Sequence, residues 1–414
     1  MLCYMEADKC RLPVLICKHM EKKMAYKEKN SGKDKQGLGQ KIAAHRRRVI
    51  LGTLLAVVLT AAFAYTFYVQ IKNQTYTGYT VVSEVNKQIY SQAEVRVYRD
   101  GYLSYSRDGI SYTDSKGNAV WNQTYEMQSP LVEVKGDWVA VGDYNGHLIY
   151  DIGPDGTARE IDTHLPIRSL TVAGNGVVAA VLEDSDVTWI NVYNPNGENA
   201  VGIKTTMQKS GYPVSISLAD SGKLLQVAYL RVESGSMKSV VSFYNFDEVG
   251  QNYTDTMVSS YEFAEAVVPM CAFMDATTAF SVADNHLVLY EGAEIPKNIC
   301  QNMLSDEIKS VFYGSSYIAL VYVSTDGSSK YRADVYDSKG NLVIRWPFLM
   351  EYKDIVFSGE NMIIYNEAEC NIVGLNGTER YDGDITKQTA LLKPLGSSRY
   401  LAVTSDSLKM IEMR

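Results

Sequence analysis

"VYDSKGN" (Val335–Asn341) is the clearest copy of a short phrase that recurs along this chain: an apolar or aromatic pair, then Asp or Asn, then a turn that contains Gly. Asn, Asp and Gly tolerate the positive φ angles of tight turns, so each copy predicts a hairpin between two strands. The phrase occurs seven times, as SYTDSKGN (Ser111–Asn118), IYDIGPDG (Ile149–Gly156), VYNPNG (Val192–Gly197), FYNFDEVG (Phe243–Gly250), LYEGAE (Leu289–Glu294), VYDSKGN and IVGLNGT (Ile372–Thr378).

The spacing of the copies indicates the size of the repeating unit. Successive copies are separated by 38, 43, 51, 46, 46 and 37 residues when they are aligned on Tyr112, Tyr150, Tyr193, Tyr244, Tyr290, Tyr336 and Val373. Two further apolar runs joined by a Gly, Asn or Ser turn precede most copies, as in Val132–Asp143 and Ser310–Ser324. Four strands in about 40 to 50 residues is the period of a β-propeller blade. The pattern therefore predicts an all-β fold, and no segment after residue 71 shows a helical stripe.

The two ends of the repeat array complement each other. The last segment, Ala390–Arg414, offers three strands, whereas Tyr79–Tyr90 is a strand without a blade of its own. Pairing this first strand beside Lys409–Arg414 would complete the last blade and remove two open sheet edges. We therefore expect a propeller over residues 79–414 with eight blades, and seven blades as the alternative.

An apolar segment precedes the propeller. Residues 49–71 carry no charge and would span roughly 34 Å as a helix, enough for a bilayer core of about 30 Å. Residues 1–48 hold 13 Lys and Arg against 5 Asp and Glu, a balance of +8. The positive-inside rule then predicts a cytoplasmic tail (1–48, disordered by composition), a transmembrane helix (49–71), a short tether (72–78) and an extracytoplasmic propeller.

A cleavable signal peptide is the competing interpretation, because Ala62-Phe63-Ala64 has the form of a cleavage site. A region of 48 residues is long for the start of a signal peptide, and apolar character continues through Ile71. An uncleaved anchor explains both facts better. The predicted location is a cell membrane, crossed once, with the N-terminus in the cytoplasm.

Composition excludes some partners. The chain has a net charge of −8, so removing the +8 of residues 1–48 leaves −16 for the rest. This charge argues against binding nucleic acid. The chain holds 30 Tyr against 10 Phe and 4 Trp, which suits strands with one buried and one wet face.

In its layout of tail, helix and propeller the chain resembles a membrane-anchored member of the quinoprotein-like and WD40-like propellers. It is also similar to a family of Gram-positive bacterial proteins described as a domain of unknown function. A quinoprotein enzyme would imply a vicinal Cys-Cys pair, Trp at recurring positions and a calcium-binding carboxylate cluster. No two cysteines are adjacent here, and Trp121, Trp138, Trp189 and Trp346 share no repeat position. We expect no enzyme and no cofactor.

Few residues suggest a chemical site, and we assign no catalytic, cofactor-binding or metal-binding residue. His147 and His286 both follow a turn, at matching positions of two blades, and His164 is the remaining histidine of the propeller. Leu182–Val187 carries three carboxylates but lacks the full calcium-loop motif. Cys3, Cys10, Cys17 and His19 lack zinc-site spacing, and Cys271, Cys300 and Cys370 do not form a disulfide framework.

The sequence leaves two functions open. The first is a binding or scaffolding module for a membrane or cell-envelope protein, or for a cell-wall glycan. The alternative is a carboxylate- or metal-dependent hydrolase or lyase on the central face of the propeller.

Overall fold

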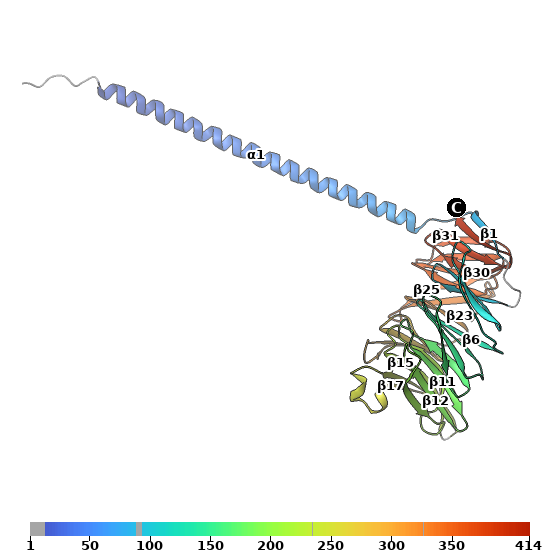
Figure 1. The fold of residues 1–414 in the computed structure, drawn as a ribbon. Coiled ribbons are helices and arrows are strands. Elements are labelled where there is room, and N and C mark those ends of the chain that lie inside the picture. The colour runs from blue at the N-terminus through green and yellow to red at the C-terminus, as the bar shows by residue number, and fades with distance from the viewer. Residues whose placement is uncertain (1–12, 88–92, 234, 326) are drawn as a thin grey trace, which may run out of the picture. The chain divides into compact units, whose positions relative to one another are not determined.

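The computed structural model describes residues 13–87, 93–233, 235–325 and 327–414. The chain divides into two compact units, residues 1–74 and residues 75–414. Figure 1 shows the first unit as one helix and the second as a set of sheets.

The first unit is the helix α1 (Pro13–Lys72). Its part Ala43–Gln70 is long and apolar enough to cross a membrane, and none of it is buried by protein. Within this stretch Thr53, Thr60 and Thr66 each donate a hydroxyl hydrogen bond of 2.9 Å to the carbonyl three residues earlier. These bonds satisfy the hydroxyls inside the helix itself, as an apolar surrounding would require.

The structure differs from the predicted disordered tail, because residues 13–48 are helical and continuous with the apolar stretch. The segment lacks the apolar residues of a packed core, and this composition predicts disorder. However, it has no proline after Pro13, and it is rich in Lys and Arg, which are good helix formers. Residues 1–12, with Cys3 and Cys10, lie outside the described residues.

The second unit confirms the predicted eight-bladed propeller, with eight antiparallel sheets of four strands each. Blades 1 to 4 contain β2 (Glu94–Tyr98), β3 (Gly101–Ser106), β4 (Gly109–Thr113) and β5 (Ala119–Thr124); β6 (Pro130–Lys135), β7 (Trp138–Asp143), β8 (Leu148–Ile152) and β9 (Ala158–Asp162); β10 (Ile167–Val172), β11 (Val178–Asp184), β12 (Val187–Tyr193) and β13 (Asn199–Thr205); and β14 (Tyr212–Leu218), β15 (Leu224–Glu233), β16 (Ser236–Asn245) and β17 (Met257–Ala264).

Blades 5 to 8 repeat the same order. They contain β18 (Met270–Phe273), β19 (Thr278–Val282), β20 (His286–Glu291) and β21 (Lys297–Met303); β22 (Ile308–Tyr313), β23 (Tyr317–Val323), β24 (Tyr331–Asp337) and β25 (Leu342–Phe348); β26 (Asp354–Ser358), β27 (Asn361–Tyr365), β28 (Glu369–Gly374) and β29 (Glu379–Asp384); and β30 (Thr389–Pro394), β31 (Arg399–Thr404), β32 (Ser407–Met413) and β1 (Tyr79–Asn86).

The last blade takes its outer strand from the beginning of the propeller. β1 pairs antiparallel with β32, from Tyr79 opposite Met413 to Asn86 opposite Ser407. Residues 88–90 of the strand predicted over 79–90 lie outside the described residues. Just before β1, Tyr76 is buried and its backbone N–H donates to the Arg380 carbonyl at 2.6 Å. The propeller therefore includes chain from Tyr76 onward, and three residues separate α1 from it.

The recurrent phrases connect the third and fourth strands of blades 1 to 7, as tight hairpins in most blades and through a longer loop in blade 4. In blade 6, Asp337 Oδ1 accepts the backbone N–H groups of Lys339 and Asn341 at 2.9 and 2.8 Å. Gly340 has a φ of +83°, and strand register shifts beside the turn. This is a turn closed by a glycine bulge, where a residue with a Cβ would be strained. The glycines Gly117, Gly156, Gly197 and Gly377 have φ of +82 to +88°.

The hairpins also hold neighbouring blades together. Gly156 of blade 2 lies against Trp121 on the outer strand of blade 1, where Gln123 Nε2 donates to the Gly156 carbonyl at 2.7 Å. Blades 5 and 6 repeat this contact, since Asn302 Nδ2 donates to the Gly340 carbonyl at 2.7 Å. These two turns thus close their own hairpins and also contact the preceding blade.

A buried carboxylate lies between blades 2 and 3. The Asp151 side chain is fully buried, and its Oδ2 accepts a hydrogen bond of 3.0 Å from Arg159, whose stem lies under Gly197. Its other oxygen has no hydrogen-bond partner among the residues that the structure describes. Burial raises the pKa of Asp151 to about 6, and the nearby Arg159 charge only partly offsets this effect.

The glycine turns give a first prediction. Gly156→Ala should lower the free energy of unfolding by about 2–4 kcal/mol, because the new Cβ would combine a positive φ with an approach of 2.5 Å to Trp121. Gly377→Ala is the matched control, since φ is also positive but no atom lies within 4 Å of the new Cβ. It should cost only about 1 kcal/mol. Urea unfolding of both variants measures the difference, and equal losses would contradict the blade contact.

Asp151 gives a second prediction. Its pKa is higher in the folded chain than the ordinary value of 3.8, so the folded state holds this proton more tightly and loses stability as the pH rises from about 4 to about 6. The full effect is up to about 3 kcal/mol. Asp151→Asn should remove this loss.

Melting temperatures measured from pH 4 to pH 8 test it. The difference between Asp151→Asn and the wild-type chain should grow in favour of the variant up to about pH 6 and then stay constant. Asp155→Asn is the control, because hydrogen bonds from Thr157 lower rather than raise the pKa of Asp155. A pH-independent difference for Asp151→Asn would contradict the burial of a titrating carboxyl.

Candidate functional site

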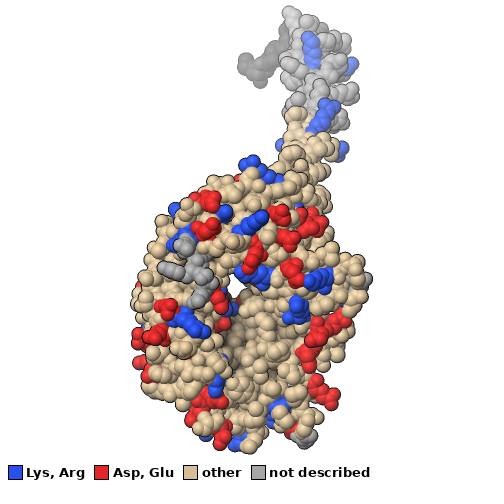
Figure 2. Space-filling model, turned by 90° about the vertical axis from the view of Figure 1, so that its right-hand side faces the viewer, with Lys and Arg blue, Asp and Glu red and all other residues tan. Residues whose placement is uncertain are grey.

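The first strand of every blade lies around a central channel. Neighbouring first strands contact one another around the ring, as β6, β10, β14 and β18 do in turn. Figure 2 shows a small opening near the centre of the ring, with basic and acidic side chains interspersed around it. Lys135 of β6 crosses part of this channel, because its Nζ donates to the Phe273 carbonyl of blade 5 at 3.1 Å and pairs with Asp220 of blade 4 at 3.2 Å.

The channel holds a carboxylate in a protein-rich surrounding. Glu133 of β6 remains accessible to water, but the protein around it raises its pKa, and Arg96 and Lys135 oppose that rise. Tyr313 of β22 is also surrounded by protein, which raises its pKa, and the negative charge of Glu133 adds to that rise. Glu133 and Tyr313 come from blades 2 and 6, so their interaction crosses the ring.

A hollow of about 530 Å³ opens beside the first strands of blades 1, 6, 7 and 8. Its walls are mainly apolar, with Val97, Val356 and Phe357 among them. Its two charged groups are already used within the fold. Asp354 accepts hydrogen bonds from the Ile355 N–H and the Tyr365 hydroxyl, and Lys393 donates to the Arg99 carbonyl.

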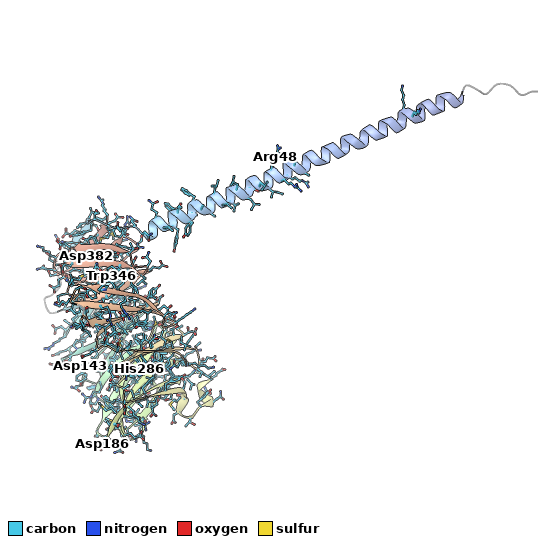
Figure 3. The ribbon with its side chains drawn as sticks, turned by 180° about the vertical axis from the view of Figure 1, so that it is seen from behind. Arg48, Asp143, Asp186, His286, Trp346 and Asp382 are labelled. Carbon is cyan, nitrogen blue, oxygen red and sulfur yellow. The ribbon has the colours of Figure 1, made fainter. Side chains whose placement is uncertain are left out.

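A larger groove of about 670 Å³ lies between blades 6 and 7. Outer strand β25 and the residues that follow it supply Trp346, Phe348, Leu349 and Met350. Blade 7 supplies polar groups on the opposite wall. Figure 3 labels Trp346 and Asp382, which belong to these two blades. We call this the acidic groove because four carboxylates line it, those of Glu351, Glu369, Glu379 and Asp382.

Hydrogen bonds orient part of the acidic groove. Trp346 Nε1 donates to Asn371 Oδ1 at 3.1 Å, and Asn371 Nδ2 in turn donates to Glu379 Oε1 at 3.0 Å. Glu351 accepts from the Tyr331 hydroxyl at 2.7 Å and pairs with Lys330, and this ion pair lowers its pKa. Asp382 is exposed and has no hydrogen-bond partner among the described residues. The groove therefore offers free acceptors beside an aromatic wall.

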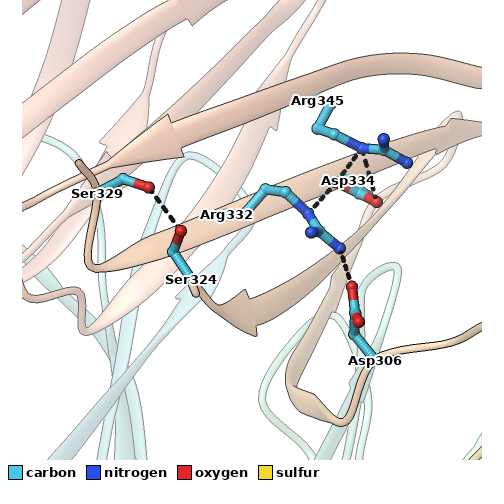
Figure 4. Close-up of polar contacts among 6 residues, drawn as sticks. All are labelled: Asp306, Ser324, Ser329, Arg332, Asp334 and Arg345. Carbon is cyan, nitrogen blue, oxygen red and sulfur yellow. Dashed lines mark hydrogen bonds and ion pairs between the residues drawn. The ribbon is translucent and has the colours of Figure 1, made fainter. Parts of the chain in front are cut away.

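Figure 4 shows polar contacts of blade 6, and of the residues drawn there Ser329 also lines the acidic groove. The buried carboxylate of Asp334 accepts from Arg332 at 2.9 Å and from Arg345 at 3.1 Å, and Arg332 also pairs with Asp306 at 2.8 Å. These arginines are neutralised by their own blade, so they do not reduce the negative charge of the acidic groove.

The histidines that the sequence singles out do not form one site. His147 and His164 both lie on Asp162, with Nδ1 to Oδ1 distances of 3.1 and 3.0 Å, and all three side chains are exposed. His286 begins β20 and its ring lies 6.1 Å from that of Phe263. His147 therefore lies just before the third strand of blade 2, and His286 lies at the start of the third strand of blade 5. The two positions match, but the side chains have different neighbours.

The other candidates have structural surroundings. In Leu182–Val187, Glu183 pairs with Arg168, and Ser185 and Asp186 form an exposed hairpin. Cys271, Cys300 and Cys370 are free thiols, and burial raises the pKa of Cys271 to about 12. Across the described residues, no group of three or more His, Cys, Asp or Glu is arranged to hold a metal ion.

Sequence reasoning missed the acidic groove. Its carboxylates belong to loop and strand positions of two successive repeats, and none of them is part of a known motif. The available signal was the acidic character of Glu369, Glu379 and Asp382 around one recurrent phrase, IVGLNGT.

The comparisons with known proteins place the chain in a family and show its fold. The model of the family of unknown function DUF5711 matches residues 72–413, so the chain belongs to this family. Sqt1 of Saccharomyces cerevisiae has a similar structure, with a TM-score of 0.52 and 10% identity over 82% of this chain and 99% of that chain. BamB from Moraxella catarrhalis has a TM-score of 0.49 and 12% identity, over 81% and 100% of the two chains. No curated protein sequence matches.

Proposed function

We propose that this chain is a membrane-held binding module, and that its acidic groove docks a basic segment of a membrane or cell-envelope protein. A β-propeller fits a binding or scaffolding role, because a rigid ring presents several grooves without moving parts. The observation that carries the proposal is the acidic groove itself, which combines four carboxylates with a wall of Trp, Phe, Leu and Met.

The chemistry of the groove favours a protein with Lys, Arg and apolar side chains. Carboxylates that lie next to aromatic rings can pair with a cation while the ring packs on its apolar stem. Leu349 is 70% exposed, which adds apolar area beside the charges. A cell-wall glycan is the other candidate partner, because sugar hydroxyls can donate to the same carboxylates.

The anchor limits where partners can be met. We propose that the apolar part of α1 spans a membrane, with Arg46, Arg47 and Arg48 on the cytoplasmic side and the propeller on the other. Only residues 73–75 separate the end of α1 from Tyr76, which is fixed in the propeller. Three extended residues reach about 10 Å, so partners should lie at the membrane surface.

Substitution of groove carboxylates tests the proposal. Glu369→Gln with Asp382→Asn should weaken capture of the partner about three- to tenfold, because each exposed charge contributes a fraction of a kcal/mol to about 1 kcal/mol. The matched control is Asp184→Asn with Asp186→Asn, which removes two exposed carboxylates far from the groove in sequence and in a different blade. Crosslinking of the full-length chain in cells, with a photoreactive residue at Leu349, measures capture.

The proposal predicts that the crosslinked peptide is rich in Lys or Arg and that its yield falls with added salt. It is contradicted if capture is equal in the groove variant and the control, or if only glycan is recovered. The enzymatic alternative would rest on Glu133, whose raised pKa suits a general acid. A hydrolytic activity that Glu133→Gln abolishes would favour that alternative.

A further inference from the structure

A second groove, of about 540 Å³, lies between blades 3 and 4 and has the opposite charge. One wall is the outer strand β13 with the turn that follows it, and the other is the outer half of blade 4. β15 and β16 are ten residues long, longer than the other strands described, and they extend this blade outward. We call this the basic groove, because Lys204, Lys209 and Arg231 line it.

The cations of the basic groove make no ion pair within the part of the chain that the structure describes. No carboxylate there is in ion-pair contact with Lys204, Lys209 or Arg231, although the charge of Arg231 helps to lower the pKa of nearby Glu233. Lys204 instead lies 5.8 Å from the ring centre of Trp189. Asp255 is the one carboxylate on the groove lining and makes no ion pair within the described chain, so the lining carries a net charge of +2. Neighbouring cations of blade 4 behave differently, since Lys223 pairs with Asp247 and Lys238 with Glu233 and Glu262.

The positive charge of the basic groove contrasts with the negative charge of the rest of the propeller. Residues 49–414 carry a net charge of −16. Three cations without an ion pair in one groove repel one another, and the attraction of Arg231 to Glu233 and the charge of Asp255 offset this repulsion only in part. Such an arrangement is stabilised when an anion binds between the charges.

The floor of the basic groove adds hydroxyl groups. The Tyr229 and Tyr244 hydroxyls lie 2.8 Å apart, and the Ser242 and Ser260 hydroxyls lie 3.0 Å apart. Each pair shares one hydrogen between two oxygens, so each pair keeps a second O–H that can be donated elsewhere. Ser260 is exposed and can present such a donor to a ligand.

The loop that forms one rim of the groove is strained. In blade 4 the recurrent phrase does not close a tight hairpin but leads into the 3-10 turns η1 (Gly250–Asn252) and η2 (Thr254–Thr256). Asp255 and Thr256 have φ of +54 and +59°, a left-handed conformation that is unfavourable for a β-branched residue such as Thr. Strain of this kind collects at ligand-binding sites, where the surrounding structure maintains it.

We propose that the basic groove binds the phosphate group of an organic phosphate, with a polyol or sugar as the organic part. The guanidinium of Arg231 can hold two phosphate oxygens at once, and the ammonium groups of Lys204 and Lys209 act as point charges on the others. A phosphomonoester carries close to two negative charges at neutral pH, which matches the +2 of the lining. The Ser hydroxyls and the apolar side chains of Ile203 and Met257 face the organic part. This inference is independent of the acidic groove.

Titration calorimetry on the full-length chain in a neutral detergent tests the proposal. The probes are inorganic phosphate, glycerol phosphate, glucose 6-phosphate, and nanodiscs with or without phosphatidylglycerol. We expect a phosphate ester to bind, with an affinity that falls as salt is raised from about 50 to 200 mM. Lys204→Gln with Arg231→Gln should weaken binding at least tenfold. Lys223→Gln, a paired cation of the same blade, should leave it unchanged.

The outcomes separate the sources of the phosphate. Saturable binding of a soluble phosphate ester supports a free ligand, and binding only to nanodiscs with the anionic lipid supports a headgroup at the same site. Binding that Lys223→Gln weakens as much as the groove variant overturns the proposal. The proposal is also overturned if no probe produces heat at about 10 mM, because a dissociation constant in the millimolar range or below would then be excluded.

A second variant tests the strained rim without removing a charge. Thr256→Gly relieves the left-handed strain, so the melting temperature should rise by about 2–4 °C. If the strain shapes the site, the same variant should bind the phosphate ester at least threefold more weakly. A stabilised variant with unchanged affinity would show that the rim has no part in binding.

Discussion

The pairing of β1 with β32 is the constraint on which the rest of the structure depends. Seven of the eight sheets are built from consecutive strands, and each could form once its own hairpins are made. The eighth joins strands from the two ends of the propeller, so it forms only when every other blade is in place. Without it, β32 and the first blade would expose unpaired or unpacked edges, which attract other strands.

Closure also explains why the hairpin glycines matter beyond their own turns. Gly117 of blade 1 lies against Val85 of β1, just as Gly156 lies against Trp121 of the preceding blade. The same contact is therefore made across the joint between the ends of the chain and between consecutive blades. Lys87, directly after β1, donates to the Gly117 carbonyl at 3.3 Å and adds a polar contact at this joint.

The ring leaves the grooves between blades free to differ in chemistry. Backbone pairing and the apolar clusters between blades hold the fold, and the side chains on the outer strands that lie outside these clusters are free to differ. The acidic groove between blades 6 and 7 and the basic groove between blades 3 and 4 use these positions. Opposite charge in two grooves of one ring fits a module that holds two different partners.

The repeat determines what could be predicted from the sequence. The period of the repeat, its turn residues and the unpaired strand at Tyr79 were sufficient to predict eight blades, because hairpins with Asn, Asp and Gly have few conformations.

The grooves could not be predicted in the same way. The strand register shifts beside Tyr336 and Val373. The alternation of inward and outward side chains along the sequence therefore does not predict which face of the sheet Trp346 or Glu379 occupies. The long strands β15 and β16, which build the basic groove, depend on a hairpin at Ser236 that lies outside the recurrent phrase. The scarcity of apolar residues before residue 49 likewise predicted a disordered tail, although residues 13–48 are helical in the structure.

The most direct test of the closed ring is a comparison of two shortened chains by thermal unfolding, one starting at Thr75 and one starting at Ala93. Both retain blades 1 to 7, but only the first contains β1. We predict one cooperative transition for the chain from Thr75, and a melting temperature lower by at least about 10 °C, or association through open edges, for the chain from Ala93. Equal melting temperatures for two monomeric chains would contradict the closure of the propeller by its first strand.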